Sequence, residues 1–428
     1  MTYTLEIKLN SLGLDDYLEK RFKYGYKLKR AVENWFNTQE HRRITSQGYK
    51  ELTERMKQQS ELQKEISETK DKALKLQLKG EFKERSEELK KDWIELNNSF
   101  LLNSSKFVDY KNLGQASAMY NQYSSEGIIN WSTFENIAAT VKAAYLKRRK
   151  QSESDNRLTI TKYRDFNTLW YRKCNQNITM DGVWFGPRGK KILIPYAFRK
   201  GDDIKLSYAM ERQKLAWYGL KRVVLKNGRY KYSVLLVFDG APYGVETEFL
   251  QTGEVNIWVD INSLSIKAQN LSNGQLVEFD ISNDYGYAAK LSELDRKIER
   301  SRRLSNPQNY EENGTIKPGR SKWVFSKNYY RLLNQKRYLW HKIKKSRKNR
   351  FGEIINTILD LGDTFIISKK DFKSLQSRKD YNPEEMSWFD TRRQHGFEIM
   401  FNAPYEFVEL LKIKLQYRDS TPSIVVEK

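Results

Sequence analysis

The hydrophobic pattern of the chain changes its period along its length. The opening stretch "TYTLEIKL" alternates apolar and polar residues, which is typical of a strand, and from about Leu14 apolar residues recur at helical spacing. Residues 49–100 are rich in Lys and Glu, with sparse apolar positions and a break at Gly80. We therefore expect long, exposed helices that could pair, and helical character to about Lys173.

β-Branched and aromatic residues dominate the next section. In "KKILIPYAFRKGDDIKLSYAM" and "WYGLKRVVLKNGRYKYSVLLVFDG" they surround turn signals such as Lys226-Asn227-Gly228. This pattern predicts a small β barrel or sheet over about 183–250.

The last section predicts a second sheet. "VNIWVDINSLSIKAQNLSNGQLVEFDI" contains three short strand candidates, with Asn273-Gly274 as the turn between the second and third. Long basic helices are expected from about Tyr285 to Asp360, interrupted by a loop around "NPQNYEENGTIKPG". "DTFIIS" then indicates a buried strand, "APYEFVELLKIKLQYR" a helix with Pro404 in its first turn, and "PSIVVEK" a last strand. This order of elements is that of an RNase H-like sheet, one helix short.

Composition places the chain among folded proteins with a polyanionic partner. A chain of 428 residues with 39% apolar content can build two or three domains. Lys and Arg number 77 against 54 Asp and Glu, a net charge of +23 that favours nucleic acid over an anionic membrane. We find no apolar run of about 18 residues and no signal-peptide pattern, so we expect a soluble cytoplasmic protein without a membrane partner.

Cysteine and histidine are scarce. Cys174 is the one cysteine, and the three histidines are His41, His341 and His395. This inventory excludes a disulfide framework and a Cys or Cys/His zinc site. Cys174 is better explained as a buried small apolar residue or an idle thiol.

Asp260 is the first candidate for catalytic chemistry. It ends the apolar strand "NIWVD", where a carboxylate would point out at the edge of the sheet. An RNase H-type nuclease holds two divalent metals between several acids from different strands. Asp260 is therefore either the first of those acids or an aspartate that caps the turn into "INSLS".

A second acid is missing from the position that the geometry requires. The strand "DTFIIS" ends in Ser368-Lys369-Lys370, where a basic residue would repel Mg²⁺ and a serine alone would ligate it poorly. Asp371 lies beyond the strand, and Asp363 begins it at the opposite end.

The basic helices are the second candidate site. Residues 285–350 contain 19 Lys or Arg against 5 Asp or Glu, interleaved with Trp323, Tyr329, Tyr330, Tyr338 and Trp340. Cations and flat side chains together suit a nucleic-acid backbone. The alternative is a packed aromatic face with solvated lysines. Packing is the better interpretation of each single aromatic residue, whereas the charge surplus of the whole stretch favours nucleic-acid binding.

Four stretches carry a family resemblance: "VDINSLSIKAQNLSNG", "LDRKIERSRRLSNPQNYEENGTIKPGRSKWVFSKNYYRL", "RKNRFGEIINTILDLGDTFIISKKDFKSLQSR" and "NAPYEFVELLKIKLQYRDSTPSIVVEK". Residues 255–428 resemble the RuvC domain of TnpB proteins, transposon-encoded RNA-guided nucleases related to type V CRISPR effectors. The resemblance implies an α+β multidomain fold. An OB-like wedge barrel (1–12 and 183–252) is split by a helical recognition domain (13–182). A RuvC-like α/β domain follows (253–428), with long basic helices at 285–360; it is truncated after its fifth strand and lacks the zinc ribbon.

The chain departs from that family at the positions of the catalytic acidic residues. Aligning "DFKSLQ" with the family's turn places Ser368 at the position of the second acid, and a shifted register places Lys369 or Lys370 there. The chain ends before the two CxxC pairs and the last catalytic Asp, which leaves a vestigial Asp260. In this respect the chain is similar to TldR, the nuclease-dead TnpB-like repressors.

This resemblance implies an RNA-guided protein without catalytic activity. It would bind a guide RNA and a matching duplex DNA next to a short motif and repress transcription on a bacterial nucleoid, with no zinc, catalytic Mg²⁺ or small-molecule substrate. We expect the basic side chains of the guide or heteroduplex channel to be Arg296, Lys297, Arg300, Arg302, Arg303, Arg320, Lys322, Lys327 and Arg331.

Two other functions stay open. The chain could be a nuclease with an unusual site made by Asp260, Asp371 and Glu427, or one completed by a separate polypeptide. It could also be an RNA-binding remnant that engages no DNA.

Overall fold

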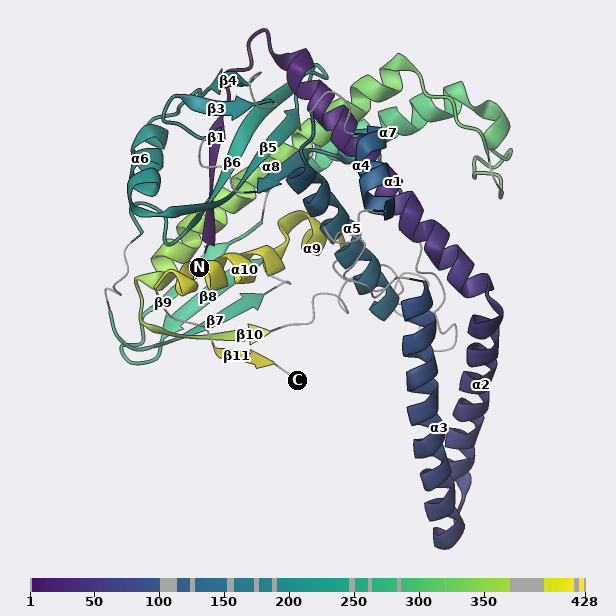
Figure 1. Ribbon diagram of the computed structural model, residues 1–428. Helices are drawn as coiled ribbons and strands as arrows, with labels where there is room; N and C mark the ends of the chain where they lie inside the picture. Colours follow the sequence, from purple (N-terminus) through teal and green to yellow (C-terminus); the bar gives the residue numbers. More distant parts are fainter. Residues whose placement is uncertain are drawn as a thin grey trace.

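The chain folds into two β-sheets and a set of long helices, an α+β architecture (Figure 1). The computed structural model describes the following residues: 2–100, 114–123, 128–151, 158–172, 177–186, 191–245, 251–260, 264–282, 286–319, 321–369, 396–418 and 423–426.

The first sheet joins the N-terminal strand to strands far along the chain. Its order is β1-β6-β5-β2, with every neighbouring pair antiparallel. The four strands are β1 (Thr2–Lys8), β2 (Thr168–Arg172), β5 (Lys214–Val224) and β6 (Tyr230–Asp239). The expected Asn227-Gly228 turn connects β5 and β6, with Gly228 at φ +87°. A separate hairpin of β3 (Gly182–Phe185) and β4 (Ile192–Pro195) contacts β1 through a bridge between Leu9 and Tyr196.

Strand β2 corrects the expectation of helix to about residue 173. Helix α5 ends at Gln151, and "TLWYR" pairs with β5, burying Leu169 and Tyr171 on alternate positions. Five residues are too few for this alternation to outweigh the helical pattern before it.

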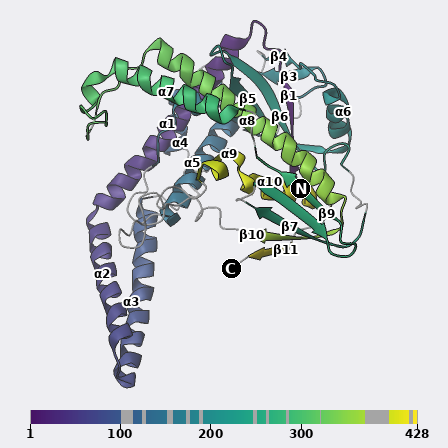
Figure 2. The same cartoon turned by 180° about the vertical axis from the view of Figure 1, so that it is seen from behind.

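In the sequence, five described α-helices lie between β1 and β2, the next strand of the first sheet. They are α1 (Asp15–Thr45), α2 (Gln47–Glu68), α3 (Lys72–Ser99), α4 (Gly114–Tyr123) and α5 (Trp131–Gln151), and the shorter α6 (Asp202–Arg212) follows β4. Helices α2 and α3 pack together as a hairpin that projects from the body in both views (Figures 1 and 2). The expected paired, exposed helices are thus confirmed.

Gly80, expected to break the helix, lies inside α3. A glycine in a helix interior costs about 1 kcal/mol relative to alanine, which a helix of 28 residues tolerates.

The second sheet has the order β11-β10-β7-β8-β9. Its strands are β7 (Glu254–Asp260), β8 (Ser265–Asn270), β9 (Leu276–Asp280), β10 (Thr364–Lys369) and β11 (Ser423–Val426). β7, β8 and β9 are antiparallel, whereas β10 runs parallel to β7 and β11. The predicted sequence of three strands, helix, strand, helix and strand is confirmed, as is Pro404 in the first turn of a helix.

Helices α8 (Lys327–Leu359) and α10 (Pro404–Gln416) cover one face of the second sheet. Helices α7 (Tyr287–Ser305) and α9 (Gly396–Asn402) pack against α8 in a separate small cluster that contains Leu291, Ile343 and Phe401. Phe351 of α8 and Phe407 of α10 pack into the core with the buried residues Val259 and Ile367 of the sheet. The buried Arg347 of α8 donates to Glu406 (2.6 Å) and ties the two helices together. The opposite face of the sheet carries the partly exposed side chains.

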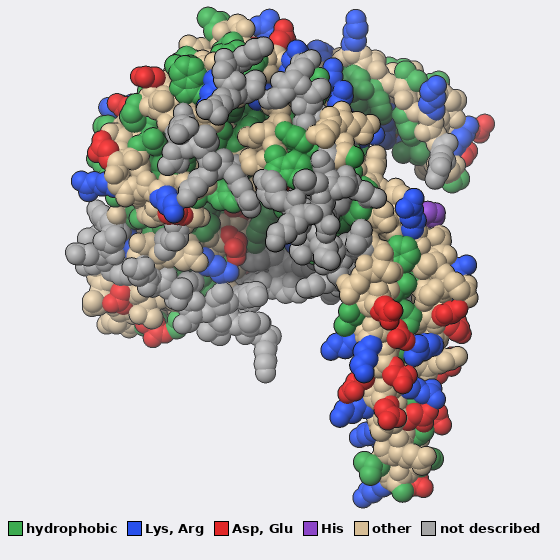
Figure 3. Space-filling model, viewed as in Figure 1, with side chains coloured by type: hydrophobic (Ala, Val, Ile, Leu, Met, Phe, Trp, Pro, Cys, Tyr) green, Lys and Arg blue, Asp and Glu red, His purple; other side chains and the backbone are tan. Residues whose placement is uncertain are grey.

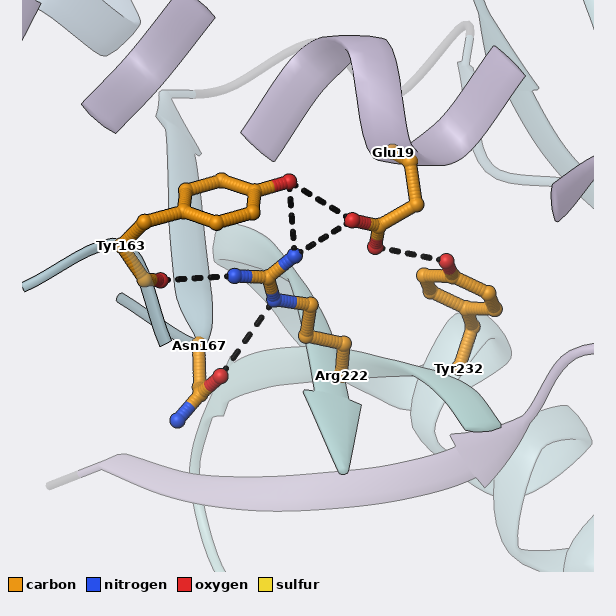
Figure 4. A network of polar contacts seen from close by, with 5 residues as sticks. All are labelled: Glu19, Tyr163, Asn167, Arg222 and Tyr232. Atoms are coloured by element: carbon orange, nitrogen blue, oxygen red, sulfur yellow. Dashed lines mark hydrogen bonds and ion pairs between the residues drawn. The ribbon is translucent and has the colours of Figure 1, made fainter. Parts of the chain in front are cut away.

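A buried ion pair fastens α1 to the first sheet (Figure 4). The guanidinium of Arg222, with no exposed side-chain surface, donates to Glu19 of α1 (2.6 Å), to the Tyr163 hydroxyl (3.0 Å) and to Asn167 (3.3 Å). The Tyr232 hydroxyl donates to the other Glu19 oxygen (2.7 Å). Burial and the hydrogen bond to Glu19 raise the pKa of Tyr163 to about 12, so this hydroxyl remains protonated at neutral pH.

We predict that Arg222→Met lowers the free energy of unfolding by about 3 kcal/mol, because the substitution leaves Glu19 without its cation. The matched control is Arg55→Met, since Arg55 and Asp92 are both 42% exposed and an exposed pair contributes less than about 1 kcal/mol. Urea unfolding of the three proteins measures both effects. Equal losses in the two variants would contradict the structural role of Arg222.

Candidate nucleic-acid interface

Helices α7 and α8 pack side by side, and the loop between them is clamped by two buried asparagines. The Asn306 side chain donates to Arg302 O (2.8 Å) and Val324 O (2.7 Å) and accepts from Val324 N (2.6 Å). Asn309 donates to Lys322 O (2.9 Å). These bonds hold the backbone of the return segment against the end of α7.

One face of α7 carries three arginines at helical spacing. Arg296, Arg300 and Arg303 follow the i, i+4, i+7 pattern, and we call them the α7 row. They line an open groove of about 1340 Å³ together with Lys336 of α8. Two acids line the same groove: Glu299 pairs with Arg303 (3.1 Å), and Asp295 pairs with Lys336. Trp340 and Met400 add apolar surface to the same groove. Three of the basic residues expected from the sequence therefore lie on one continuous surface.

The other expected cations have mixed surroundings. Lys297 and Arg331 line a second groove of about 630 Å³, which also includes Arg300 of the α7 row. Lys322 and Lys327 are exposed. Arg302 is held by the protein itself, in an ion pair with Glu299 (2.5 Å) and over the Trp323 ring at 5.2 Å. Arg320 lies outside the described residues.

The aromatics of this stretch mostly contact one another. Trp323 packs edge-on against Tyr310, Tyr329 stacks on Phe325 at 4.5 Å, and Trp340 contacts Phe401. Tyr330 is the most exposed of the group at 47%. Packing thus accounts for Trp323, Tyr329 and Trp340, whereas Tyr330 presents its ring to solvent.

A second group of basic residues, absent from the sequence expectation, lies between the first sheet and α8. We call it the sheet cluster: Lys8, Lys221, Lys231, His341 and Lys345. The carboxylate among them, Glu6, accepts from Lys221 (2.8 Å) and from Ser233 (2.7 Å). Burial and the contact with Lys8 lower the pKa of Lys231, and the charges of Lys345 and Arg199 lower it further. Like charges gathered in this way favour an anionic partner.

Only the strand register could have revealed the sheet cluster. Lys8 and Lys221 both lie opposite Ser233 in the pairing of β1, β6 and β5, so residues far apart in sequence become neighbours. His341 and Lys345 are one helical turn apart on α8. Their i, i+4 spacing was visible in the sequence, but the strands that they approach were not.

Asp260 and Ser368 lie at the same end of two neighbouring parallel strands. β7 alternates partly exposed and buried residues with Asp260 on the partly exposed face, and the pairing of Ile366 with Asn256 puts Ser368 on that same face. Asp363 lies at the other end of β10, where it accepts from Gly253 N (3.1 Å). The strand-end positions expected for the first two acids therefore do meet, with a serine at the second.

A cation also occupies this face. Lys267 of β8 pairs with Glu278 of β9 (3.1 Å), and Asp260 is near enough for its charge to affect the pKa of Glu278. Hydrogen bonds from Lys267 and Ser265 lower that pKa, which the charge of Asp260 opposes. Within the described residues, no group of three or more His, Cys, Asp or Glu side chains is arranged to hold a metal ion.

Other residues named in the sequence analysis also lie outside the described residues: Cys174, Lys370, Asp371, His395 and Glu427. Lys369 is described only as the last backbone position of β10.

Comparisons with known proteins give a distant likeness in structure alone. No family model and no curated protein matches the chain. A solved Cas12f1–sgRNA–target DNA complex is 15% identical, with 100% of this chain and 89% of that chain covered and a TM-score of 0.44. A CRISPR–Cas12f ternary complex is 14% identical over the same shares, with a TM-score of 0.25. With TM-scores below 0.5, neither structure bears on the function of this chain.

The described part of the chain contains no helix with the length and apolar character needed to cross a membrane.

We predict that His341 makes the fold sensitive to mild acid. Burial, with the charges of Lys221, Lys345 and Lys231, lowers the pKa of His341. The unfolded chain therefore takes up the proton first as the pH falls through about 6.5, and stability is lost until the pH drops below the folded pKa. His341→Gln should lose less stability than the unsubstituted protein between pH 7.5 and 5. Urea midpoints at the two pH values measure this; an equal loss would contradict it.

Proposed function

We propose that this chain is an RNA-guided, nuclease-inactive DNA-binding protein that represses transcription. It binds a guide RNA and a matching duplex DNA next to a short motif, and base pairing selects the sequence. The observation that carries this proposal is the placement of the α7 row and the sheet cluster along one long basic helix, α8.

The charge distribution supports a nucleic-acid backbone as the partner. Helices α2 and α3 together contain eleven basic and eleven acidic residues, and Figure 3 shows the two signs intermixed on the projecting hairpin. The excess charge is therefore concentrated elsewhere, and residues 285–350 alone hold a surplus of 14 (19 basic minus 5 acidic). Phosphates neutralise such a surplus without regard to base sequence.

The sheet face around Asp260 supports binding without cutting. A two-metal nuclease needs converging carboxylates, and here the neighbouring strand offers Ser368 while Lys267 lies on the same face. The described donors therefore do not fit a pair of divalent metals. In this proposal Asp260 is vestigial and the chain is not an enzyme.

The finer architecture follows from the same proposal. The five-stranded sheet serves as the RuvC-like domain, and its strand order, with three antiparallel strands followed by two parallel ones, supports this assignment. The four-stranded sheet with the β3–β4 hairpin serves as the wedge domain, and α1 to α5 as the recognition domain inserted into it.

We predict that reversing the α7 row weakens RNA binding without changing which sequence is chosen. Arg296→Glu, Arg300→Glu and Arg303→Glu combined should reduce affinity at least tenfold at 0.1 M salt. The slope of log affinity against log salt should become shallower by roughly 2 to 3, because each phosphate contact contributes about 0.7 in a single strand and about 0.9 in a duplex. The control is Lys79→Glu, Lys83→Glu and Lys90→Glu on α3, an equal change of charge at three exposed positions. Equal losses in both variants would mean that only net charge matters.

We predict that the purified protein carries one defined RNA and binds a duplex that matches its tail without cutting it. Sequencing the copurified RNA identifies the guide, and gel shifts with matched and scrambled duplexes in Mg²⁺ measure binding and cleavage together. Cleavage that Asp260→Ala abolishes would identify a nuclease instead. A heterogeneous RNA population without duplex binding would identify an RNA-binding remnant.

A further inference from the structure

A third cavity lies between strand β1 of the first sheet and helices α6, α8 and α10, apart from both the α7 row and the sheet cluster. Its volume is about 550 Å³, within the range of roughly 300–1,000 Å³ that is typical of small-molecule sites. Its walls come from five places in the chain: the start of β1, α6, the turn after β6, α8 and α10. Figure 1 shows the N-terminus beside α10 at this junction.

Tyrosines and aliphatic side chains form the apolar part of the wall. Tyr3 is 8% exposed and packs on Phe238, with ring centroids 6.0 Å apart. Tyr243 is 48% exposed, yet its ring rests edge-on against Tyr208 at 5.3 Å. Tyr243 is therefore held in place while one side stays uncovered. Ile413 of α10, 43% exposed, adds a second apolar surface to the cavity.

The charged part of the wall is cationic. Lys205 of α6 and Lys348 of α8 both line the cavity and are exposed. No carboxylate is among the described lining residues, and no described ion pair includes either lysine. Burial raises the pKa of Tyr3 to about 12, with further contributions from Tyr208 and Tyr417, so its hydroxyl can donate a hydrogen bond at neutral pH.

We propose that this cavity binds a nucleotide, with the planar base against Tyr243 and Ile413 and the phosphate at Lys205 and Lys348. An aromatic ring offers every base a stacking surface, and two uncompensated lysines offer a phosphate its counter-charge. A neutral aromatic ligand would leave the lysines without a counter-charge, and an aliphatic anion would leave the ring face in water. The nucleotide is either a free mononucleotide or a single nucleotide of a bound strand. The second source rests on the proposed function.

The first arm of the test measures binding of free mononucleotides. Isothermal titration calorimetry of the full chain with AMP, GMP, CMP and UMP should show one site. Adenosine alone, or inorganic phosphate alone, should bind at least tenfold more weakly. Tyr243→Ala, and separately Lys205→Glu with Lys348→Glu, should each weaken binding at least tenfold. The matched control, Lys83→Glu with Lys90→Glu on α3, should bind as the unsubstituted protein does.

The second arm tests a nucleotide within a strand. The protein is bound to its copurified RNA and a duplex carrying 5-iodouracil, irradiated, and the cross-linked peptide is mapped. A cross-link at Tyr243 that Lys205→Glu with Lys348→Glu abolishes identifies a nucleotide of the strand. Mononucleotide binding without a cross-link identifies a free ligand. If neither signal appears in a protein that still shifts its RNA in a gel, the proposed binding at this cavity is wrong, and the proposed function is unaffected.

Discussion

Helix α8 imposes the constraint on which the rest of the structure depends. It carries ten basic residues and one acidic residue, yet it must bury a stripe that includes Ile343, Phe351 and Ile358. The buried stripe and the ion pair between Arg347 and Glu406 fix its rotation against the second sheet. Once that rotation is fixed, the remaining cations can only face α7, the first sheet or solvent. The α7 groove and the sheet cluster both follow from the packing of this one helix.

The strands that the sequence predicts are those with a local signal of their own. β7 and β10 are short apolar runs, and the Asn273-Gly274 turn marks the hairpin between β8 and β9. β2 lacks such a signal, because its place depends on a partner strand. A side chain at Gly219 of β5 would come within 2.8 Å of the Trp170 ring, so this glycine makes room for β2. A fit of this kind is invisible until the two segments lie side by side.

The α7 row and the sheet cluster differ in the same way, because one has a local signal in the sequence and the other depends on tertiary contacts. The α7 row can be found from spacing, since Arg296, Arg300 and Arg303 share one helix and its period is known. The sheet cluster cannot, because Lys8 and Lys231 become neighbours only through the pairing of β1 with β6. Arg302 and Arg303 show the reverse error: their residue type suits a phosphate contact, but both already form an ion pair with Glu299. Spacing finds candidate cations, whereas tertiary contacts decide which of them are available.

The partly exposed face of the second sheet, which carries Asp260, bears on the proposed absence of nuclease activity. A metal ion in a nuclease neutralises a strand and also activates the attacking water. A lysine ammonium can neutralise a phosphate but cannot activate water in that way. Lys267 lies on the face that contains Asp260, and Ser368 adds no charge to it. Lys267 is already paired with Glu278, so in the proposed function the retention of a strand depends on the basic surfaces along α8 and not on this face.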